Sequence, residues 1–354
     1  MEPKRKLRVA INGFGRIGKT VLRAILDRAS GEIEVVAINE LAIIEEVVHL
    51  FLHDTTFGRF PGSVGVLASQ FCGPGVSNML IVTGSAPIQY LSEPDPAKLP
   101  WRELDVDVVL ECTGRFVDRE SAEAHIRAGA KCVIISAPAK GVPLYVVGVN
   151  HGGYQGEHII SNASCTTNCA AVVARAIDEA FKITHAKLTT MHAGTAGQNV
   201  VDGTPPGRKG GDLRLARATI GNLIPTKTGA AKSVGDVLPA LLGKFDGIAV
   251  RDGRTDVSLC DLTFVVQHPT SVEEVNAALC AAAVNPSYDF VLAHTIEPLV
   301  SSDFLRDPHS AIVDLPLTRV IGETLVSVMA WYDNEWGYSC RMVDMARHVA
   351  RSLA

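Results

Sequence analysis

The feature that most constrains the fold is the segment Gly13-Phe-Gly15-Arg-Ile-Gly18. It directly follows a predicted strand, residues 7–12, and opens a predicted helix, residues 16–27, which is the context that makes a Gly-x-Gly-x-x-Gly pattern informative. The first glycine permits a tight turn, the second lets the backbone approach a pyrophosphate, and the third allows close packing of helix on strand. The helix N-terminus would then bind the phosphates. A glycine-rich turn without a ligand is the alternative.

Position 40 carries the acid that usually accompanies such a motif. The second predicted strand, residues 34–38, is followed by Asn39 and Glu40, at about the 20-residue distance that this motif shows in dinucleotide-binding folds. A carboxylate there accepts hydrogen bonds from both ribose hydroxyls and repels a 2′-phosphate, so the pattern favours NAD over NADP. Without the glycines, Glu40 would equally well be an ordinary exposed loop acid.

The order of apolar runs predicts an α/β fold in two parts. In the first part, strands such as residues 106–111 and 131–136 alternate with helical patterns, which is typical of a doubly wound, Rossmann-type parallel sheet. Residues 57–100 are rich in Gly, Pro and Ser and predict an irregular excursion with antiparallel strands. Beyond residue 160, longer strands and segregated helices predict an α+β catalytic domain. We therefore expect a cofactor domain over residues 1–164, completed by a C-terminal helix at 336–354, and a catalytic domain over 165–335.

Composition excludes several classes of protein. The chain has 354 residues, which suggests about two domains, and its net charge of −5 argues against a nucleic-acid binder. No run approaches the ~18 apolar residues of a membrane span. The eight cysteines are scattered and form no Cys-x-x-Cys pair, which indicates a reducing compartment and argues against a zinc ribbon. We expect a cytoplasmic protein without a metal site.

A second motif, residues 161–169, places a cysteine between hydroxyl side chains. Cys165 lies where a helix is predicted to begin, near Ser164, and a helix N-terminus stabilises a thiolate, the nucleophilic form. Among the eleven histidines, His192 ends an apolar strand before a loop, where active-site residues are often found. A capped core cysteine and a structural histidine are the alternatives. Cys169, one helical turn on, is expected to pack inward.

The cysteine and the dinucleotide motif together predict a chemistry. A thiolate that attacks an aldehyde forms a hemithioacetal, which can pass a hydride to a nicotinamide and leave a thioester. A second nucleophile then opens the thioester. The combination therefore predicts an aldehyde-oxidising enzyme.

These segments are similar to those of the phosphorylating glyceraldehyde-3-phosphate dehydrogenase family, from one end of the chain to the other. The similar blocks are Ile11–Gly18, Ala37–Glu40, Ser161–Cys169, Thr228–Lys232 and Trp331–Tyr338.

The resemblance implies roles for individual residues. It implies that Cys165 is the nucleophile, that His192 is its base, and that Asn334 holds the nicotinamide carboxamide. Further cofactor contacts implied are Gly13, Gly15, Arg16, Ile17, Gly18, Glu40, Thr113 and Ser136. Donors implied for the substrate phosphate and for inorganic phosphate are Ser164, Thr166, Thr195, Thr228, Gly229 and Arg251. A homotetramer is also implied, because residues 194–225 resemble the family's loop that packs on a neighbouring subunit.

Three departures from the family pattern bear on specificity. Glu40 stands where the family usually has Asp. The segment Arg251-Asp-Gly-Arg254 replaces Arg-Val-Pro-Thr, so that Asp252 brings a negative charge beside Arg251 and Arg254 becomes an alternative phosphate ligand. Residues 203–215 are a few residues longer than usual.

Two further hypotheses remain open. Glu40 and its neighbouring text resemble the sister enzyme erythrose-4-phosphate dehydrogenase, whereas Thr195 and the pair Thr228-Gly229 resemble the glyceraldehyde-3-phosphate enzymes, which we favour because these residues would touch the phosphates. A non-catalytic nucleotide-binding protein on the same fold is the alternative of another class.

Overall fold

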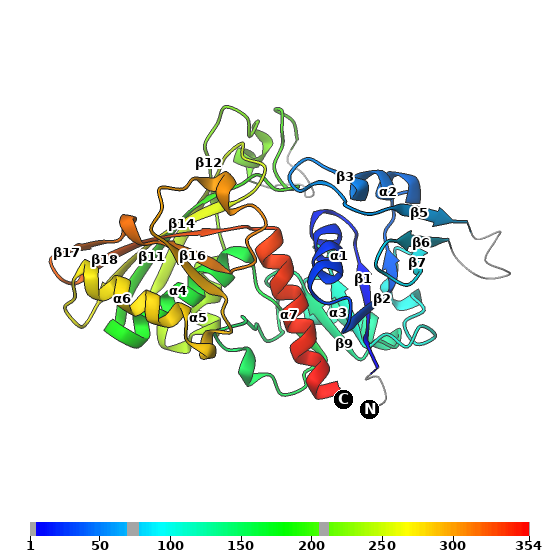
Figure 1. Ribbon diagram of the computed structural model, residues 1–354, viewed down its shortest axis with the longest axis horizontal. Helices are drawn as coiled ribbons and strands as arrows, with labels where there is room; N and C mark the ends of the chain where they lie inside the picture. The colour runs from blue at the N-terminus through cyan, green and yellow to red at the C-terminus, as the bar shows by residue number, and fades with distance from the viewer. Residues whose placement is uncertain (1–4, 69–77, 205–211, 354) are drawn as a thin grey trace. The chain divides into compact units, whose positions relative to one another are not determined.

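The computed structural model describes residues 5–68, 78–204 and 212–353 (Figure 1). The chain divides into two compact units. The first comprises Met1–Tyr145, Gly153–Asn162 and Ser339–Ala354, and the second comprises Val146–Gly152 and Ala163–Tyr338. The sequence placed one boundary after residue 164, whereas the structure assigns residues 146–152 to the second unit.

The first unit is built on an eight-stranded sheet of order β10-β9-β8-β1-β2-β7-β6-β5. Strands β10 to β7 in this order run parallel, and β6 and β5 are antiparallel additions from the predicted excursion. The doubly wound parallel sheet is thus confirmed. Its strands are β1 (Leu7–Asn12), β2 (Ile33–Asn39), β5 (Val64–Leu67), β6 (Met79–Val82), β7 (Ile88–Leu91), β8 (Val108–Glu111), β9 (Cys132–Ile135) and β10 (Ile159–Ser161).

Short helices connect these strands. They are α1 (Arg16–Arg28), α2 (Ile44–Leu52) and α3 (Arg119–Arg127), and a two-stranded ribbon, β3 (His53–Asp54) with β4 (Gly58–Arg59), follows α2. Strand β1 lies between β2 and β8, where the chain reverses its direction of travel across the sheet. Ligands of open parallel sheets bind at the carboxyl ends of the strands beside such a reversal. The glycine turn follows β1 at this edge.

A buried polar network lies under the same edge. Glu111, at the end of β8, is 1% exposed and accepts hydrogen bonds from Asn12 Nδ2 at 2.5 Å and from the N–H of Thr113 at 2.8 Å. His125 Nε2 lies 3.1 Å from the same carboxylate, and its Nδ1 accepts from Trp101 Nε1 at 3.0 Å. Since Nδ1 accepts, the ring proton is on Nε2 and faces Glu111. The carboxylate is therefore satisfied despite its burial.

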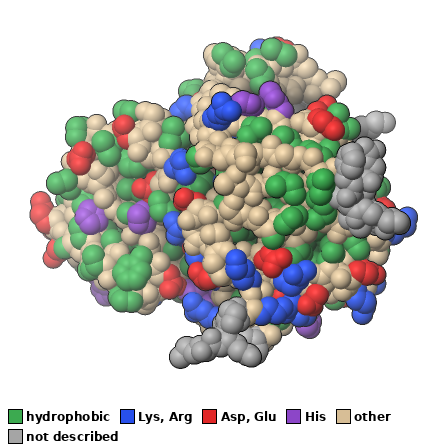
Figure 2. Space-filling model, turned by 45° about the vertical axis from the view of Figure 1, so that its right-hand side comes forward, with side chains coloured by type: hydrophobic (Ala, Val, Ile, Leu, Met, Phe, Trp, Pro, Cys, Tyr) green, Lys and Arg blue, Asp and Glu red, His purple; other side chains and the backbone are tan. Residues whose placement is uncertain are grey.

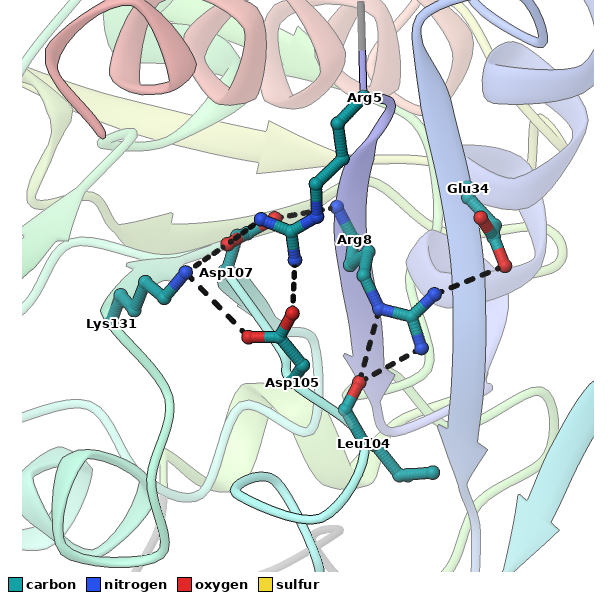
Figure 3. Close-up of polar contacts among 7 residues, drawn as sticks. All are labelled: Arg5, Arg8, Glu34, Leu104, Asp105, Asp107 and Lys131. Carbon is teal, nitrogen blue, oxygen red and sulfur yellow. Dashed lines mark hydrogen bonds and ion pairs between the residues drawn. The ribbon is translucent and has the colours of Figure 1, made fainter. Parts of the chain in front are cut away.

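Ion pairs fasten the amino end of β1 to its neighbours (Figure 3). Asp107 accepts from Lys131 Nζ at 2.7 Å and from the N–H of Arg8 at 2.9 Å, and Arg8 also donates to the carbonyl of Leu104. Arg5 pairs with both Asp105 and Asp107. On the face of the molecule that Figure 2 shows, Lys and Arg side chains lie among Asp and Glu side chains. The exposed pair of Arg5 with Asp105 contributes little net stability, whereas the buried Asp107 binds the N–H of Arg8 near the start of β1.

The second unit is built on another eight-stranded sheet, of order β12-β13-β11-β14-β18-β16-β15, with β17 paired to β18. It is mostly antiparallel; β11 with β13 and β15 with β16 are parallel pairs. The strands are β11 (Ile183–His192), β12 (Ile224–Lys227), β13 (Phe245–Arg251), β14 (Ser258–Val266), β15 (Leu292–Thr295), β16 (Ala311–Asp314), β17 (Arg319–Ile321) and β18 (Leu325–Tyr332).

Helices α4 (Cys165–Phe181), α5 (Ala230–Val237) and α6 (Val272–Ala283) cover one face of this sheet (Figure 1). The sequence predicted one helix over 228–242, but α5 ends at Val237 because Pro239 has no N–H to continue the ladder, and a 3₁₀ turn follows. The last helix, α7 (Trp336–Leu353), begins in the second unit, and its residues from Ser339 onward belong to the first. None of the described helices has the length and apolar character needed to cross a bilayer.

Buried carboxyl groups fasten the turn between β18 and α7. Asp333 accepts hydrogen bonds from the N–H groups of Arg306 at 2.8 Å, Glu335 at 3.0 Å and Trp336 at 2.6 Å. Asp256 lies beside it and is 4% exposed. Burial, followed by the negative charges of Asp333 and Glu335, raises the pKa of Asp256 from 3.8 to about 9. The N–H donors favour the ionised form of Asp333, so the proton of this pair resides on Asp256.

We expect Asp256→Asn to stabilise the protein increasingly as pH rises. Above pH 4 the unfolded chain releases the proton of Asp256, while the native state retains it until the pH nears 9. The native state thus binds more protons, and wild-type stability falls with rising pH in this window. Asparagine has no proton to lose, so its advantage should grow by at most about 1.4 kcal/mol per pH unit. Urea unfolding between about pH 5 and 8 measures this.

The exposed Asp246 on β13 supplies the control, because Asp246→Asn makes the same chemical change at a carboxyl group that is not buried. An Asp256→Asn variant whose advantage is constant across this range would contradict the assignment of the proton.

Candidate functional site

The glycine turn after β1 is shaped by close backbone contacts. Gly13 has φ +87°, and a Cβ there would lie 2.7 Å from the N of Thr113. A Cβ on Gly18 would lie 2.1 Å from the carbonyl oxygen of Gly13, so the first turn of α1 rests directly on the loop. Among the described residues, no atom lies within 4 Å of the position that a Cβ of Gly15 would take. The middle glycine thus leaves open space at the helix N-terminus.

The N-terminus of α1 is suited to an anion. Gly15, at its N-cap, has no side chain with which to bind the first N–H groups, and the first turn contains Arg16, Ile17 and Gly18 rather than an acid. Uncapped N–H groups and the positive end of the helix dipole favour phosphate. The residues present therefore fit the pyrophosphate of a dinucleotide.

Glu40 contacts the glycine turn itself, which the sequence did not predict. One carboxylate oxygen accepts the N–H of Phe14 at 2.7 Å, and the other accepts the N–H of Leu41 at 2.7 Å. A carboxylate has about four acceptor sites, so the half-exposed Glu40 retains capacity for hydroxyl groups. Its negative charge beside the turn disfavours a further phosphate on the ribose.

The other predicted cofactor residues lie at the same edge of the first sheet. Thr113 follows β8, with its hydroxyl hydrogen-bonded to Glu111, and Ser136 follows β9, with its N–H donated to the carbonyl of Glu111. Arg16 forms an ion pair with Asp54, and its guanidinium lies 5.6 Å from the ring centre of Phe57. The side chain of Arg16 is thus held by α1's own neighbours. Ile17 is partly exposed on the first turn of α1.

In the second unit, Cys165 is the first residue of α4, as the sequence predicts. The Ser164 side chain caps this helix by accepting the N–H of Thr167 at 3.0 Å. Cys165 is partly exposed, whereas Cys169, one turn later, is fully buried with its Sγ 4.0 Å from the carbonyl oxygen of Ala330. Only the first of the two thiols is therefore accessible to a substrate.

His192, the last residue of β11, faces this thiol. Its Nε2 lies 3.5 Å from the Sγ of Cys165, and its Nδ1 lies 2.8 Å from the carbonyl oxygen of Ala193. A carbonyl can only accept, so Nδ1 carries the ring proton and Nε2 presents a lone pair to the thiol. The histidine is thereby oriented as a base for Cys165.

The electrostatics bear on the expectation that the N-terminus of α4 stabilises a thiolate at Cys165. Burial raises the pKa of Cys165 to about 11, although Thr166 and the charge of Arg251 act in the opposite direction. Burial also lowers the pKa of His192 to about 4, with the hydrogen bond to Ala193 opposing it. Desolvation thus opposes the stabilisation that a helix N-terminus gives to a thiolate. Transfer of the thiol proton to His192 would form the thiolate and leave two opposite charges 3.5 Å apart.

Tyr332 connects the elements that carry the pair, and the sequence analysis did not single it out. Its buried hydroxyl lies 2.9 Å from the Oγ1 of Thr166 on α4 and 2.8 Å from the Oγ1 of Thr190 on β11. Its ring meets the ring of His192 edge-on, at 6.1 Å between centres. Thr166, a predicted phosphate ligand, is thus hydrogen-bonded within the protein.

Cationic and hydroxyl groups lie at the same end of the sheet. Arg251, paired with His192 in the β11–β13 register, donates to the Oγ1 of Thr195 at 2.8 Å. Arg254 instead pairs with Asp252 at 2.6 Å and donates to the carbonyl of Met191. The guanidinium of Arg254 is therefore bound to Asp252, whose negative charge it neutralises.

The remaining predicted residues of the second unit occupy two places. Thr228 and Gly229 directly precede α5, where the Thr228 hydroxyl accepts the N–H of Ala230 at 3.1 Å. Asn334 is buried in the β18–α7 turn, with its Oδ1 2.6 Å from the hydroxyl of Ser258. The lengthened stretch at 203–215 lies partly outside the described residues, since 205–211 are not described.

Both units match models of known protein families. Residues 7–119 match "Glyceraldehyde 3-phosphate dehydrogenase, NAD binding domain", and residues 164–334 match "Glyceraldehyde 3-phosphate dehydrogenase, C-terminal domain".

Several named relatives are similar over nearly the whole chain. The glyceraldehyde-3-phosphate dehydrogenase of Xanthobacter flavus is 48% identical over 342 residues, 96% of this chain and 97% of the relative. That of Zymomonas mobilis is 47% identical over 98% of this chain and 99% of its own length. The cytosolic enzyme of Chlamydomonas reinhardtii is 46% identical over 99% and 98%. A glycine turn fitted to a dinucleotide, a thiol faced by an oriented imidazole and similarity over both units lead to one conclusion: this chain belongs to the glyceraldehyde-3-phosphate dehydrogenase family, and its first unit carries that family's NAD-binding domain.

Proposed function

We propose that this protein oxidises D-glyceraldehyde 3-phosphate, with NAD and inorganic phosphate, to 1,3-bisphosphoglycerate. The observation that carries the proposal is the contact between Cys165 Sγ and His192 Nε2 at 3.5 Å, in a chain of this family. When bound, NAD supplies the acceptor for the hydride that leaves the substrate.

The residues of the second unit divide the chemistry between them. His192 Nε2 takes the thiol proton as the Sγ of Cys165 bonds to the aldehyde carbon, and the protonated ring then donates to the oxygen of the hemithioacetal. As the hydride leaves, Nε2 takes that hydroxyl proton and a thioester remains on Cys165. A phosphate oxygen attacks the thioester carbon, the carbon–sulfur bond breaks, and the sulfur regains its proton through His192.

Donor side chains near Cys165 support a phosphorylated substrate. Arg251 is close enough to lower the pKa of Cys165 by its charge, and its guanidinium is already directed at Thr195. Guanidinium and hydroxyl donors are suited to phosphate. In this proposal Thr195 and Arg251, with Ser164, Thr166, Thr228 and Gly229, supply the two phosphate sites, and Asn334 binds the nicotinamide carboxamide.

A homotetramer and a cytoplasmic location are parts of the same proposal. The stretch 194–225 exposes large apolar side chains, which in a soluble protein usually mark an interface; they are Val200, Val201, Leu213, Ile220 and Leu223. The Chlamydomonas reinhardtii relative is named as a cytosolic enzyme, which supports the cytoplasmic location.

We expect light scattering to give a mass near four times 37.7 kDa. A single-chain mass at micromolar concentration would contradict the assembly and would leave the proposed chemistry intact.

The paired aldehyde assay tests the substrate. We expect NADH formation to depend on inorganic phosphate and to show a larger kcat/KM for glyceraldehyde 3-phosphate than for erythrose 4-phosphate. A larger value for erythrose 4-phosphate would assign the sister activity, and a phosphate-independent rate would indicate hydrolysis. If Cys165→Ser still produced NADH, the cysteine mechanism would be wrong, and a wild-type protein that made none would favour the non-catalytic alternative.

Thiol reactivity tests the proton transfer. Burial holds the pKa of an isolated Cys165 thiol at about 11, so its reactivity near neutral pH depends on His192. We expect His192→Asn to slow alkylation of Cys165 by iodoacetamide by at least about tenfold, as loss of a general base commonly does. Cys280, on α6 and partly exposed, provides an internal reference whose rate should not change. Cys72 lies outside the described residues and serves no comparison.

Peptide mapping after short exposures gives both rates from one sample. Equal alkylation of Cys165 in the wild type and in His192→Asn would contradict transfer of the proton to the imidazole.

A further inference from the structure

The hydroxyl of Ser258 connects two residues of the proposed reaction. Ser258 begins β14, is fully buried, and accepts the N–H of Ala193 at 3.1 Å. It also lies 2.6 Å from the Oδ1 of Asn334, to which it donates its own proton. The carbonyl of the same Ala193 accepts the Nδ1 proton of His192. The Ser258 hydroxyl thus links Asn334 to Ala193, the residue whose carbonyl orients the ring of His192.

This arrangement determines which way the amide of Asn334 faces. The Ser258 oxygen already receives the N–H of Ala193, so its proton needs an acceptor, and Oδ1 of Asn334 provides one. With the amide reversed, two donors would face each other in a fully buried position, and a donor left unsatisfied there is costly. The NH₂ group of Asn334 is therefore directed away from Ser258 and is left to donate elsewhere.

Backbone strain beside Ser258 supports a positional role. Val257 has φ +61°, a conformation that is a genuine outlier for a β-branched residue. It is nonetheless fully buried against Phe304 and Ile312, and its N–H is bound by the carboxyl of Asp256 at 2.8 Å. Strain of this kind persists only where the surroundings impose it, and it concentrates at functional sites. Here it aims the next residue, Ser258, at Asn334.

We propose that Ser258 is a positioning residue, whose hydroxyl holds the amide of Asn334 so that its NH₂ group donates to the carbonyl oxygen of the nicotinamide carboxamide. The inference rests on the proposed function, in which Asn334 binds that carboxamide. It adds a specificity: the carbonyl oxygen of the carboxamide is recognised rather than its amine. Ser258 acts through Asn334 and Ala193 and takes no part in bond making.

The test compares binding of NAD and of ADP-ribose, which lacks the nicotinamide, by calorimetry without aldehyde. We expect Ser258→Ala to weaken NAD by about tenfold, the usual effect of one lost hydrogen bond, and to leave ADP-ribose within about twofold of the wild type. Retained ADP-ribose affinity also shows that the first unit is folded, and an unchanged urea-unfolding curve shows the same for the second unit, which carries Ser258. Ser327→Ala is the matched control, because Ser327 lies on β18 of the same sheet and contacts Asp261.

Hydride stereochemistry gives a second readout. With an aldehyde deuterated at its reacting carbon, the wild type should label one face of the nicotinamide ring, and Ser258→Ala should label both faces because the carboxamide is no longer held. A dinucleotide with an acetyl group in place of the carboxamide keeps the carbonyl oxygen and should show the same tenfold sensitivity to Ser258→Ala.

The outcomes separate the two proposals. If Ser258→Ala weakens NAD and ADP-ribose equally, or weakens neither, the positioning role is overturned while the proposed activity is unaffected. If the wild type itself binds NAD no more tightly than ADP-ribose, the assigned role of Asn334 is wrong, and the inference falls with it.

Discussion

The contact between the Cys165 thiol and the His192 ring depends on two elements that end at the same point. Cys165 opens α4, which covers the second sheet, and His192 closes β11, which lies inside that sheet. A shift of one residue in β11 would turn His192 to the other face of the sheet. The Tyr332 hydroxyl, bound to both Thr166 and Thr190, resists such a shift. The register of β11 and the capping of α4 together bring Cys165 and His192 into contact.

Burial shifts the pKa values of Cys165 and His192 in opposite directions. A lone thiolate or a lone imidazolium is disfavoured at this position, and the pKa values of both groups move away from neutrality for that reason. Moving the proton from sulfur to nitrogen changes no net charge, so the cost of burying a net charge does not arise, and the attraction between the new charges opposes the remaining desolvation. In the proposed mechanism, this neutral pair becomes a nucleophile and an acid in one step.

Local signals were readable in the sequence, whereas contacts between distant segments were not. The glycine turn and the start of α4 were predictable because each depends on a few adjacent residues and on backbone conformations that favour Gly or Ser. Its place at the end of a strand singled out His192 among the eleven histidines, and the family resemblance then identified it as the partner of Cys165. The contact of Glu40 with Phe14 and the proton on Asp256 depend on tertiary packing. The pairing of Arg254 with Asp252, two residues apart, is local but was not predicted. The strands from β15 to β18 were also missed: β15, β16 and β18 pair with strands farther away in the chain, although β17 and β18 form a local hairpin.

The position of α7 has a consequence for biosynthesis. Its residues from Ser339 onward belong to the first unit, although they follow the entire second unit in the chain. They include fully buried side chains, among them Met342, Val343 and Val349. A ribosome releases the segment Met1–Tyr145 long before this helix exists, and domains generally fold as units in the order of synthesis. Until the second unit has been translated, the nascent first unit lacks these residues. The apolar surface that they cover therefore stays exposed during that time.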